Sequence, residues 1–122
     1  MTTNIMVIDD DPDLRETLRV LLVENGFGVS EAAGGQEALD LLAAGRRPNL
    51  ILLDLTMPEM SGWQFLLRIR DTDLGTIPVV IMTARPAVGT LPPPAKELLR
   101  KPFDRATLFA AIARCASPDP SP

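Results

Sequence analysis

Short apolar runs alternate along the chain with longer stretches in which apolar residues recur at helical spacing. Three runs are continuous and four residues long: Ile5–Ile8, Leu50–Leu53 and Val79–Met82. Runs of this kind predict central strands that are covered on both faces. The stretch 27–32 is more polar and predicts a strand near an edge, and Leu98 and Leu99 begin a last short strand. This alternation is typical of an α/β fold with a parallel sheet.

Four stretches carry the apolar spacing and the end signals of helices. Asp11 is a suitable N-cap before Pro12, and Gly26 ends the helix that follows. Ser61 and Gln64 have the spacing of a capping box. The residues expected to face the core are Leu14, Leu18, Leu21 and Leu22 in the first helix, Ala38, Leu41 and Leu42 in a helix over Gln36–Ala44, Phe65, Leu66 and Ile69 in the third, and Leu108, Phe109 and Ile112 in a last helix capped by Asp104.

The segment between the fourth and fifth expected strands breaks this rhythm. Pro92–Pro94 exclude a helix there, because proline lacks the amide hydrogen and clashes with the preceding turn. We expect no full helix in this segment and at most a single helical turn over Ala95–Leu98. Half of residues 117–122 are proline, so we expect a disordered tail after a single domain of residues 1–116.

Composition narrows the function classes. The chain of 122 residues is 46% hydrophobic, enough for one domain with a buried core. A net charge of -4 argues against nucleic acid or an anionic membrane as the direct partner. The single cysteine excludes an internal disulfide and fits a reducing cytoplasm. The start has no signal-peptide pattern, and no apolar run approaches the ~20 residues of a membrane helix. The absence of histidine excludes catalytic triads that contain histidine and zinc sites that have histidine ligands.

Polar residues stand where the predicted strands end. Asp9 and Asp10 follow the first strand, Asp54 the third, Thr83 the fourth, and Lys101 lies near the end of the last. Since the carboxyl ends of parallel strands meet at one edge, we expect these side chains to converge. Two carboxylates ~4 Å apart repel by about 1 kcal/mol in water and about 4 kcal/mol at an effective dielectric of 20. Raised pKa values, the lysine or a bound dication must relieve this repulsion. Oxygen ligands without histidine favour Mg²⁺ or Mn²⁺, a combination that suits phosphoryl transfer.

Four motifs, in this order, resemble those of the response-regulator receiver domain of two-component signalling. They are Val7–Asp11, Leu53–Pro58 with Gly62, Met82–Ala84, and Lys101–Phe103. The resemblance extends from Asn4 to about Cys115. It implies a doubly wound, flavodoxin-like sheet of five parallel strands in the order 2-1-3-4-5. The family's fourth helix is expected to be shortened or missing here, because of the prolines.

The resemblance also implies a role for each residue of the site. Asp54 would accept a phosphoryl group from a histidine of a sensor kinase or phosphotransfer protein. Asp9, Asp10 and the backbone carbonyl of Thr56 would bind Mg²⁺. Lys101 would contact the phosphoryl oxygens, and Thr83 would donate a hydrogen bond to the phosphoryl group. Pro58 and Gly62 would shape the loop after Asp54. The Lys101–Pro102 peptide bond is expected to be cis.

Two departures from the family leave the output open. Leu98 stands where receivers commonly have an aromatic ring, and the segment before it is short and rich in proline. The leading interpretation is a phosphoacceptor module that is not an enzyme. The alternative is a receiver-like interaction domain that phosphorylation does not switch. A dehalogenase-type phosphatase needs a second aspartate two residues after the nucleophile, where this chain has Thr56. The kinase, the downstream partner, and whether the chain stands alone or is part of a longer protein stay open.

Overall fold

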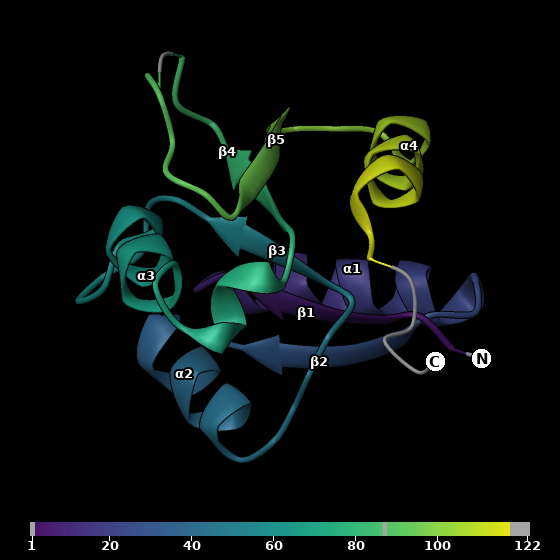
Figure 1. Cartoon of the computed structure of the whole chain (residues 1–122). Coiled ribbons are helices and arrows are strands. Elements are labelled where there is room, and N and C mark those ends of the chain that lie inside the picture. Colours follow the sequence, from purple (N-terminus) through teal and green to yellow (C-terminus); the bar gives the residue numbers. More distant parts are fainter. Residues whose placement is uncertain (1, 87, 118–122) are drawn as a thin grey trace.

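The computed structural model describes residues 2–86 and 88–117, and these form one five-stranded parallel sheet with helices on both faces (Figure 1). The strands are β1 (Asn4–Ile8), β2 (Gly28–Ala32), β3 (Leu50–Asp54), β4 (Val79–Thr83) and β5 (Ala95–Arg100). The helices are α1 (Pro12–Glu24), α2 (Gly35–Ala43), α3 (Gly62–Ile69) and α4 (Arg105–Cys115), with a short 3-10 helix η1 (Asp73–Thr76) that the sequence did not predict. The strand order is β2-β1-β3-β4-β5, so the expected fold class is confirmed.

Alternate residues of the central strands enter two separate hydrophobic clusters. Ile5 and Val7 of β1 are buried with residues of α1 and α4, whereas Met6 and Ile8 are buried with residues of α2 and α3. Each of the four side chains is fully buried, and such burial stabilises a fold by about 1.5–3 kcal/mol per large apolar side chain. The continuous apolar runs of the sequence are therefore explained by a sheet whose two faces are both covered.

Three of the four helices, α1, α3 and α4, begin where the capping residues of the sequence predict. The carboxylate of Asp11 accepts hydrogen bonds from two amides in the first turn of α1, and that of Asp104 accepts from the Thr107 amide in α4. Ser61 and Gln64 form both hydrogen bonds of a capping box at the start of α3. These local bonds satisfy amides that no helix can satisfy internally, and they fix the helix starts close to the strand ends.

The segment between β4 and β5 has no helix in its described residues, as predicted. The single helical turn that the sequence allows at most over Ala95–Leu98 does not form, because these residues begin β5. The physical reason is the pairing with β4. The Val79 amide already donates to the Pro94 carbonyl at 3.1 Å, and Ala95 lies opposite Val79 in the parallel register. Pro93 and Pro94 form a turn before the strand, in which the Ala95 amide donates to the Pro92 carbonyl at 3.2 Å, and the ladder then continues the chain as a strand.

The end of the described chain is tied back to the domain. Both the amide and the hydroxyl of Ser117 donate to the carbonyl of Asn49, at 3.0 and 3.2 Å. The tail expected over residues 117–122 otherwise lies outside the described residues, and the domain limit at residue 116 stays a prediction.

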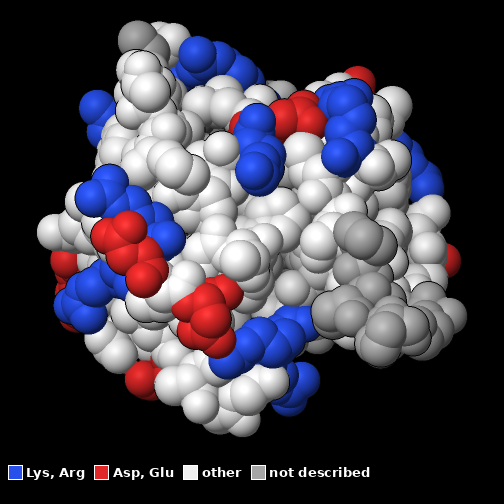
Figure 2. All heavy atoms as spheres, viewed as in Figure 1, with Lys and Arg blue, Asp and Glu red and all other residues white. Residues whose placement is uncertain are grey.

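Acidic and basic side chains adjoin one another on the face shown in Figure 2, around a broad uncharged area. Three ion pairs at the surface join Arg47 with Asp73, Arg70 with Asp71, and Arg114 with Glu97. Among the described residues, the face shown in Figure 2 has no broad basic patch of the kind that binds a phosphate backbone. Within the described part of the chain, every helix is too short or too polar to cross a membrane.

Candidate functional site

Three carboxylates converge at the carboxyl edge of the sheet. Asp9 follows β1 directly and Asp54 is the last residue of β3, and these two strands are neighbours in the sheet. One ligand oxygen from each of Asp9, Asp10 and Asp54 lies within 4.8 Å of the others. Asp9 is 1% exposed and Asp54 6% exposed, whereas Asp10 is open to solvent. The cluster is therefore a partly buried concentration of negative charge with one side accessible from outside.

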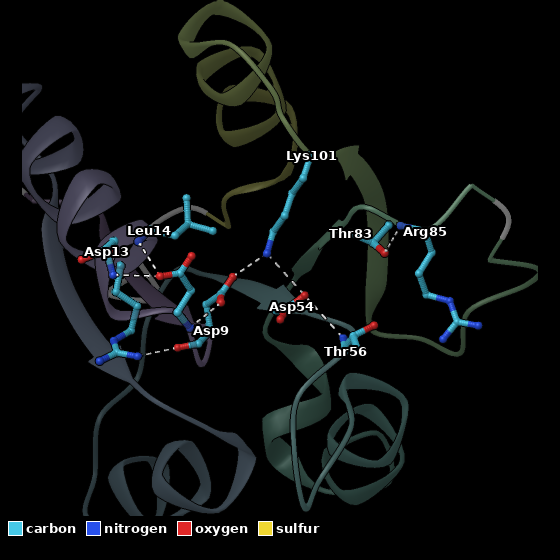
Figure 3. Close-up of polar contacts among 10 residues, drawn as sticks. Asp9, Asp13, Leu14, Asp54, Thr56, Thr83, Arg85 and Lys101 are labelled. Carbon is cyan, nitrogen blue, oxygen red and sulfur yellow. Dashed lines mark hydrogen bonds and ion pairs between the residues drawn. The ribbon is translucent and has the colours of Figure 1, made fainter.

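Lys101 lies between two of these carboxylates, as Figure 3 shows. Its Nζ is 2.8 Å from Asp9 Oδ2 and 3.5 Å from Asp54 Oδ1. Burial lowers the pKa of Lys101, but the hydrogen bond and charge of Asp9, together with Asp54, more than offset it, so the pKa is raised above its ordinary value. The ammonium group thus stays charged and offsets part of the repulsion between the carboxylates.

The carboxyl group of Asp54 is the one whose ionisation the site disfavours. Burial, and after it the charge of Asp9, raise the pKa of Asp54 to about 6, although Lys101 and the Thr56 amide act in the opposite direction. The Thr56 amide donates to Asp54 Oδ1 at 3.4 Å. Lys101 alone therefore leaves excess negative charge, and a second cation among these oxygens would remove it.

The position of Asp9 is fixed from α1. The Arg15 guanidinium donates to the Asp9 carbonyl at 2.7 Å and also pairs with Glu31 on β2, at 3.5 Å. The Asp11 amide donates to Asp9 Oδ1 at 2.9 Å. The sequence analysis did not single out Arg15. The position of Arg15 could have predicted this contact, because it lies one turn into a helix that starts at the end of β1. A long side chain at such a position can reach back to the strand.

Gly62 explains how α3 approaches the end of β3. A Cβ atom on Gly62 would lie 2.7 Å from the Asp54 backbone oxygen and 2.8 Å from Leu55 Cα, closer than real Cβ contacts. The Gly62 amide donates to the Leu55 carbonyl at 2.9 Å. Only glycine therefore lets α3 begin directly beside the strand end that carries Asp54.

Thr83 ends β4 and is 1% exposed. Its Oγ1 accepts a hydrogen bond from the Arg85 amide at 3.0 Å, so the hydroxyl holds the turn that follows its own strand (Figure 3). On the other side of Lys101, the peptide bond to Pro102 is cis, as the resemblance implies. The structure thus brings the predicted residues to one edge of the sheet, while the roles of Thr83 and of the Thr56 carbonyl stay predictions.

Comparisons with known proteins give one family. The model of the response regulator receiver domain matches residues 5–113. Response regulator MprA of Mycobacterium sp. strain KMS is 39% identical over 129 residues, which cover 100% of this chain and 55% of that protein. MprA of Mycobacterium tuberculosis strain H37Ra is 36% identical over 126 residues, covering 98% and 54%. The chain therefore spans about half the length of the curated relatives it matches.

Solved structures show the same architecture. Chemotaxis protein CheY4 of Vibrio cholerae superimposes with a TM-score of 0.81 at 28% identity, over 93% of this chain and 98% of that one. Response regulator TrrA of Thermotoga maritima, solved in complex with Mg²⁺ and BeF, gives a TM-score of 0.80 at 28% identity, with the same coverage of both chains.

Proposed function

The chain belongs to the response regulator receiver domain family of two-component systems, and from that premise we propose that Asp54 is the phosphoacceptor of a Mg²⁺-dependent switch. The observation that carries this proposal is the convergence of the Asp9, Asp10 and Asp54 oxygens within 4.8 Å, with Lys101 between Asp9 and Asp54. Asp54 is the residue of this set that ends a buried strand and contacts both Lys101 and the Thr56 amide.

The proposed reaction is a phosphoryl transfer between two side chains. A carboxylate oxygen of Asp54 attacks the phosphorus of a phosphohistidine on a sensor kinase or phosphotransfer protein. The new O–P bond forms as the P–N bond breaks, and the electron pair of that bond returns to the imidazole, which takes up a proton. Lys101, 3.5 Å from Asp54 Oδ1, is placed to bind an oxygen of the incoming group. Receiver domains act in signalling and are not enzymes in general, so we expect one phosphoryl group per chain.

The residues present fit a hard divalent cation. Three carboxylates supply oxygen ligands, one of them from a solvent-exposed residue, and one lysine cannot neutralise them all. Asp9, Asp10, Asp54 and the Thr56 carbonyl would hold Mg²⁺, or Mn²⁺ in its place. Bound there, the ion would offset the negative charge of the phosphoryl oxygens. The residues of the chain would meanwhile orient the Asp54 carboxylate, through Lys101 and the Thr56 amide.

The deciding experiment is labelling with acetyl phosphate, followed by intact-protein mass spectrometry. We expect one added phosphoryl group in the presence of Mg²⁺ and none with EDTA or in Asp54→Asn. Asp11→Asn is the matched control, because it removes a carboxylate beside the same site while asparagine still caps α1. Equal labelling of the wild-type protein and Asp54→Asn would refute the assignment of the acceptor.

A second candidate function is a receiver-like interaction domain that phosphorylation does not switch. The lack of a helix among the described residues between β4 and β5 and the leucine at position 98 favour it, because both concern the face where an output is expected. Binding of a captured partner with the same affinity to the wild-type protein and Asp54→Asn, with and without phosphodonor, would support this alternative. The intact acidic cluster favours the switch. An atypical output face, autodephosphorylation and a cytoplasmic location remain predictions.

A further inference from the structure

The turn that follows β4 is held by three contacts of one residue, Arg85. Its amide donates to Thr83 Oγ1 at 3.0 Å, and its carbonyl accepts from the Arg100 guanidinium on β5. Its own guanidinium carbon lies 5.1 Å from the centre of the Trp63 ring on α3, within the ~6 Å range of cation–π contacts. Figure 3 shows this side chain directed away from Asp54. Arg85 therefore links the end of β4 to both β5 and α3.

Trp63 has a rigid support, whereas Arg85 does not. Gly62, the preceding residue, is in close contact with the backbone at Asp54, and the capping box fixes the first turn of α3. The Trp63 ring is half-buried against the hydrophobic cluster under α2 and α3. Arg85 is exposed in a segment that has neither helix nor strand in its described residues. A change at the end of β4 would thus move Arg85 relative to a fixed indole ring.

We propose that Thr83, Arg85 and Trp63 form a relay that reports phosphorylation of Asp54 at the surface of α3, an inference that rests on the proposed function. The Thr83 hydroxyl has discrete staggered positions and can donate a hydrogen bond. When it turns to donate to a phosphoryl oxygen on Asp54, its oxygen leaves the Arg85 amide. The turn loses the bond that shapes it, and the guanidinium separates from the indole. The side chain of Leu98 on β5 has neither a polar atom nor an aromatic ring, so it offers no comparable relay.

The energies of the two contacts make the relay reversible. An exposed cation–π contact favours the state in which Arg85 covers the indole ring over the uncovered state by only about two- to fivefold. The loss of one ordinary hydrogen bond shifts an equilibrium by about the same factor or more, so release of the Arg85 amide is sufficient to uncover the Trp63 ring. The surface that changes is α3 together with the turn after β4.

The coupling is testable without any phosphoryl group. Trp63 is the one tryptophan of the sequence, so acrylamide quenching of tryptophan fluorescence reports its exposure alone. Thr83→Val removes the hydroxyl and keeps the shape, and should raise the quenching constant toward that of Arg85→Ala. Thr83→Ser keeps the hydroxyl and Arg85→Lys keeps the positive charge, so their quenching constants should stay near that of the wild-type protein. The control Arg68→Ala on α3 should also leave the quenching constant unchanged. Unchanged quenching in Thr83→Val or in Arg85→Ala overturns the relay.

Beryllofluoride with Mg²⁺, as a phosphoryl mimic, tests the signal itself. Quenching of the wild-type protein should rise to the level of Arg85→Ala, and Arg85→Ala should show no further rise. Acetyl phosphate treatment with mass spectrometry on the same proteins separates two kinds of failure. A protein that gains the phosphoryl group without a change at Trp63 overturns the relay and leaves the proposed function intact. A protein that gains none overturns both.

Discussion

Asp54→Asn should stabilise the metal-free domain at neutral pH, although it removes the proposed acceptor. In the fold, Asp54 is 6% exposed, and its burial together with the charge of Asp9 raises its pKa from 3.8 to about 6. A raised folded-state pKa means that Asp54 favours the fold most below its unfolded pKa. That contribution is lost as the pH rises through about 6. Asparagine resembles the uncharged form at every pH and avoids this loss.

The size of the effect follows from the pKa difference. The rise from 3.8 to about 6 is close to two units, and each unit corresponds to about 1.4 kcal/mol. Ionised Asp54 therefore costs the fold about 3 kcal/mol at about pH 7.5, falling to about 0.5 kcal/mol at about pH 4. Domains of this size are stable by only about 5–15 kcal/mol, so a gain of this size is readily measured.

Urea unfolding in the presence of EDTA, at the two pH values, is the assay. At the higher pH the midpoint for Asp54→Asn should lie about 1–2 M above that of the wild-type protein, and at the lower pH the two midpoints should nearly coincide. Asp71→Asn removes an exposed carboxylate that follows the end of α3, and it should change the free energy of unfolding by less than about 0.5 kcal/mol at either pH.

An equal gain for Asp54→Asn at both pH values would refute this reasoning, because a shape or packing effect does not depend on ionisation. A loss of stability at the higher pH would show that the attraction between Asp54 and Lys101, whose charged atoms are 3.5 Å apart, outweighs the cost of burial.

Three further predictions test other parts of the molecule. Millimolar Mg²⁺ should raise the unfolding temperature of the wild-type protein but not of Asp10→Asn, since a ligand at 100 times its Kd adds about 2.7 kcal/mol. Gly62→Ala should cost about 1–3 kcal/mol in urea unfolding because its Cβ would meet the backbone of β3, whereas Gly34→Ala, with nothing within 4 Å, should cost less than about 1 kcal/mol. Burial and a hydrogen bond to Glu97 raise the pKa of Cys115 to about 11. A disulfide reagent at about pH 8 should therefore react about 10-fold more slowly than with a free thiol of ordinary pKa, because a thiolate fraction about 100-fold smaller is partly offset by the higher nucleophilicity of the more basic thiolate. The reaction should be faster in Glu97→Gln.

Under the proposed function, stability and signalling oppose each other at this site. The buried Asp54 and its neighbouring carboxylate are expected to destabilise the metal-free fold, and the same features would attract a cation and, with it, a phosphoryl group. Functional sites commonly combine groups whose charges conflict until the ligand arrives. The expected gain of Asp54→Asn in stability, with loss of labelling, would show both consequences in a single variant.

The sequence by itself determined the local elements and the list of candidate residues. Apolar runs, capping residues such as Asp11 and Ser61, and the three consecutive prolines act within a few residues of the chain, so their effects can be predicted from spacing alone. Asp9 and Asp54 could likewise be placed at strand ends, because the runs that precede them have the length and composition of buried strands.

Tertiary structure decided everything that depends on pairing across the chain. Lys101 contacts Asp9 across 92 residues of sequence, and no local pattern fixes that 2.8 Å distance or the burial that raises the pKa of Asp54. Ala95–Leu98 became a strand because β4 offered a ladder, where the local sequence allowed a helical turn. The contact of Arg85 with Trp63 has the same origin, since the fold alone brings the turn after β4 beside α3. Local propensity is a weak preference, whereas backbone pairing, burial and charge act between whichever groups the fold places together.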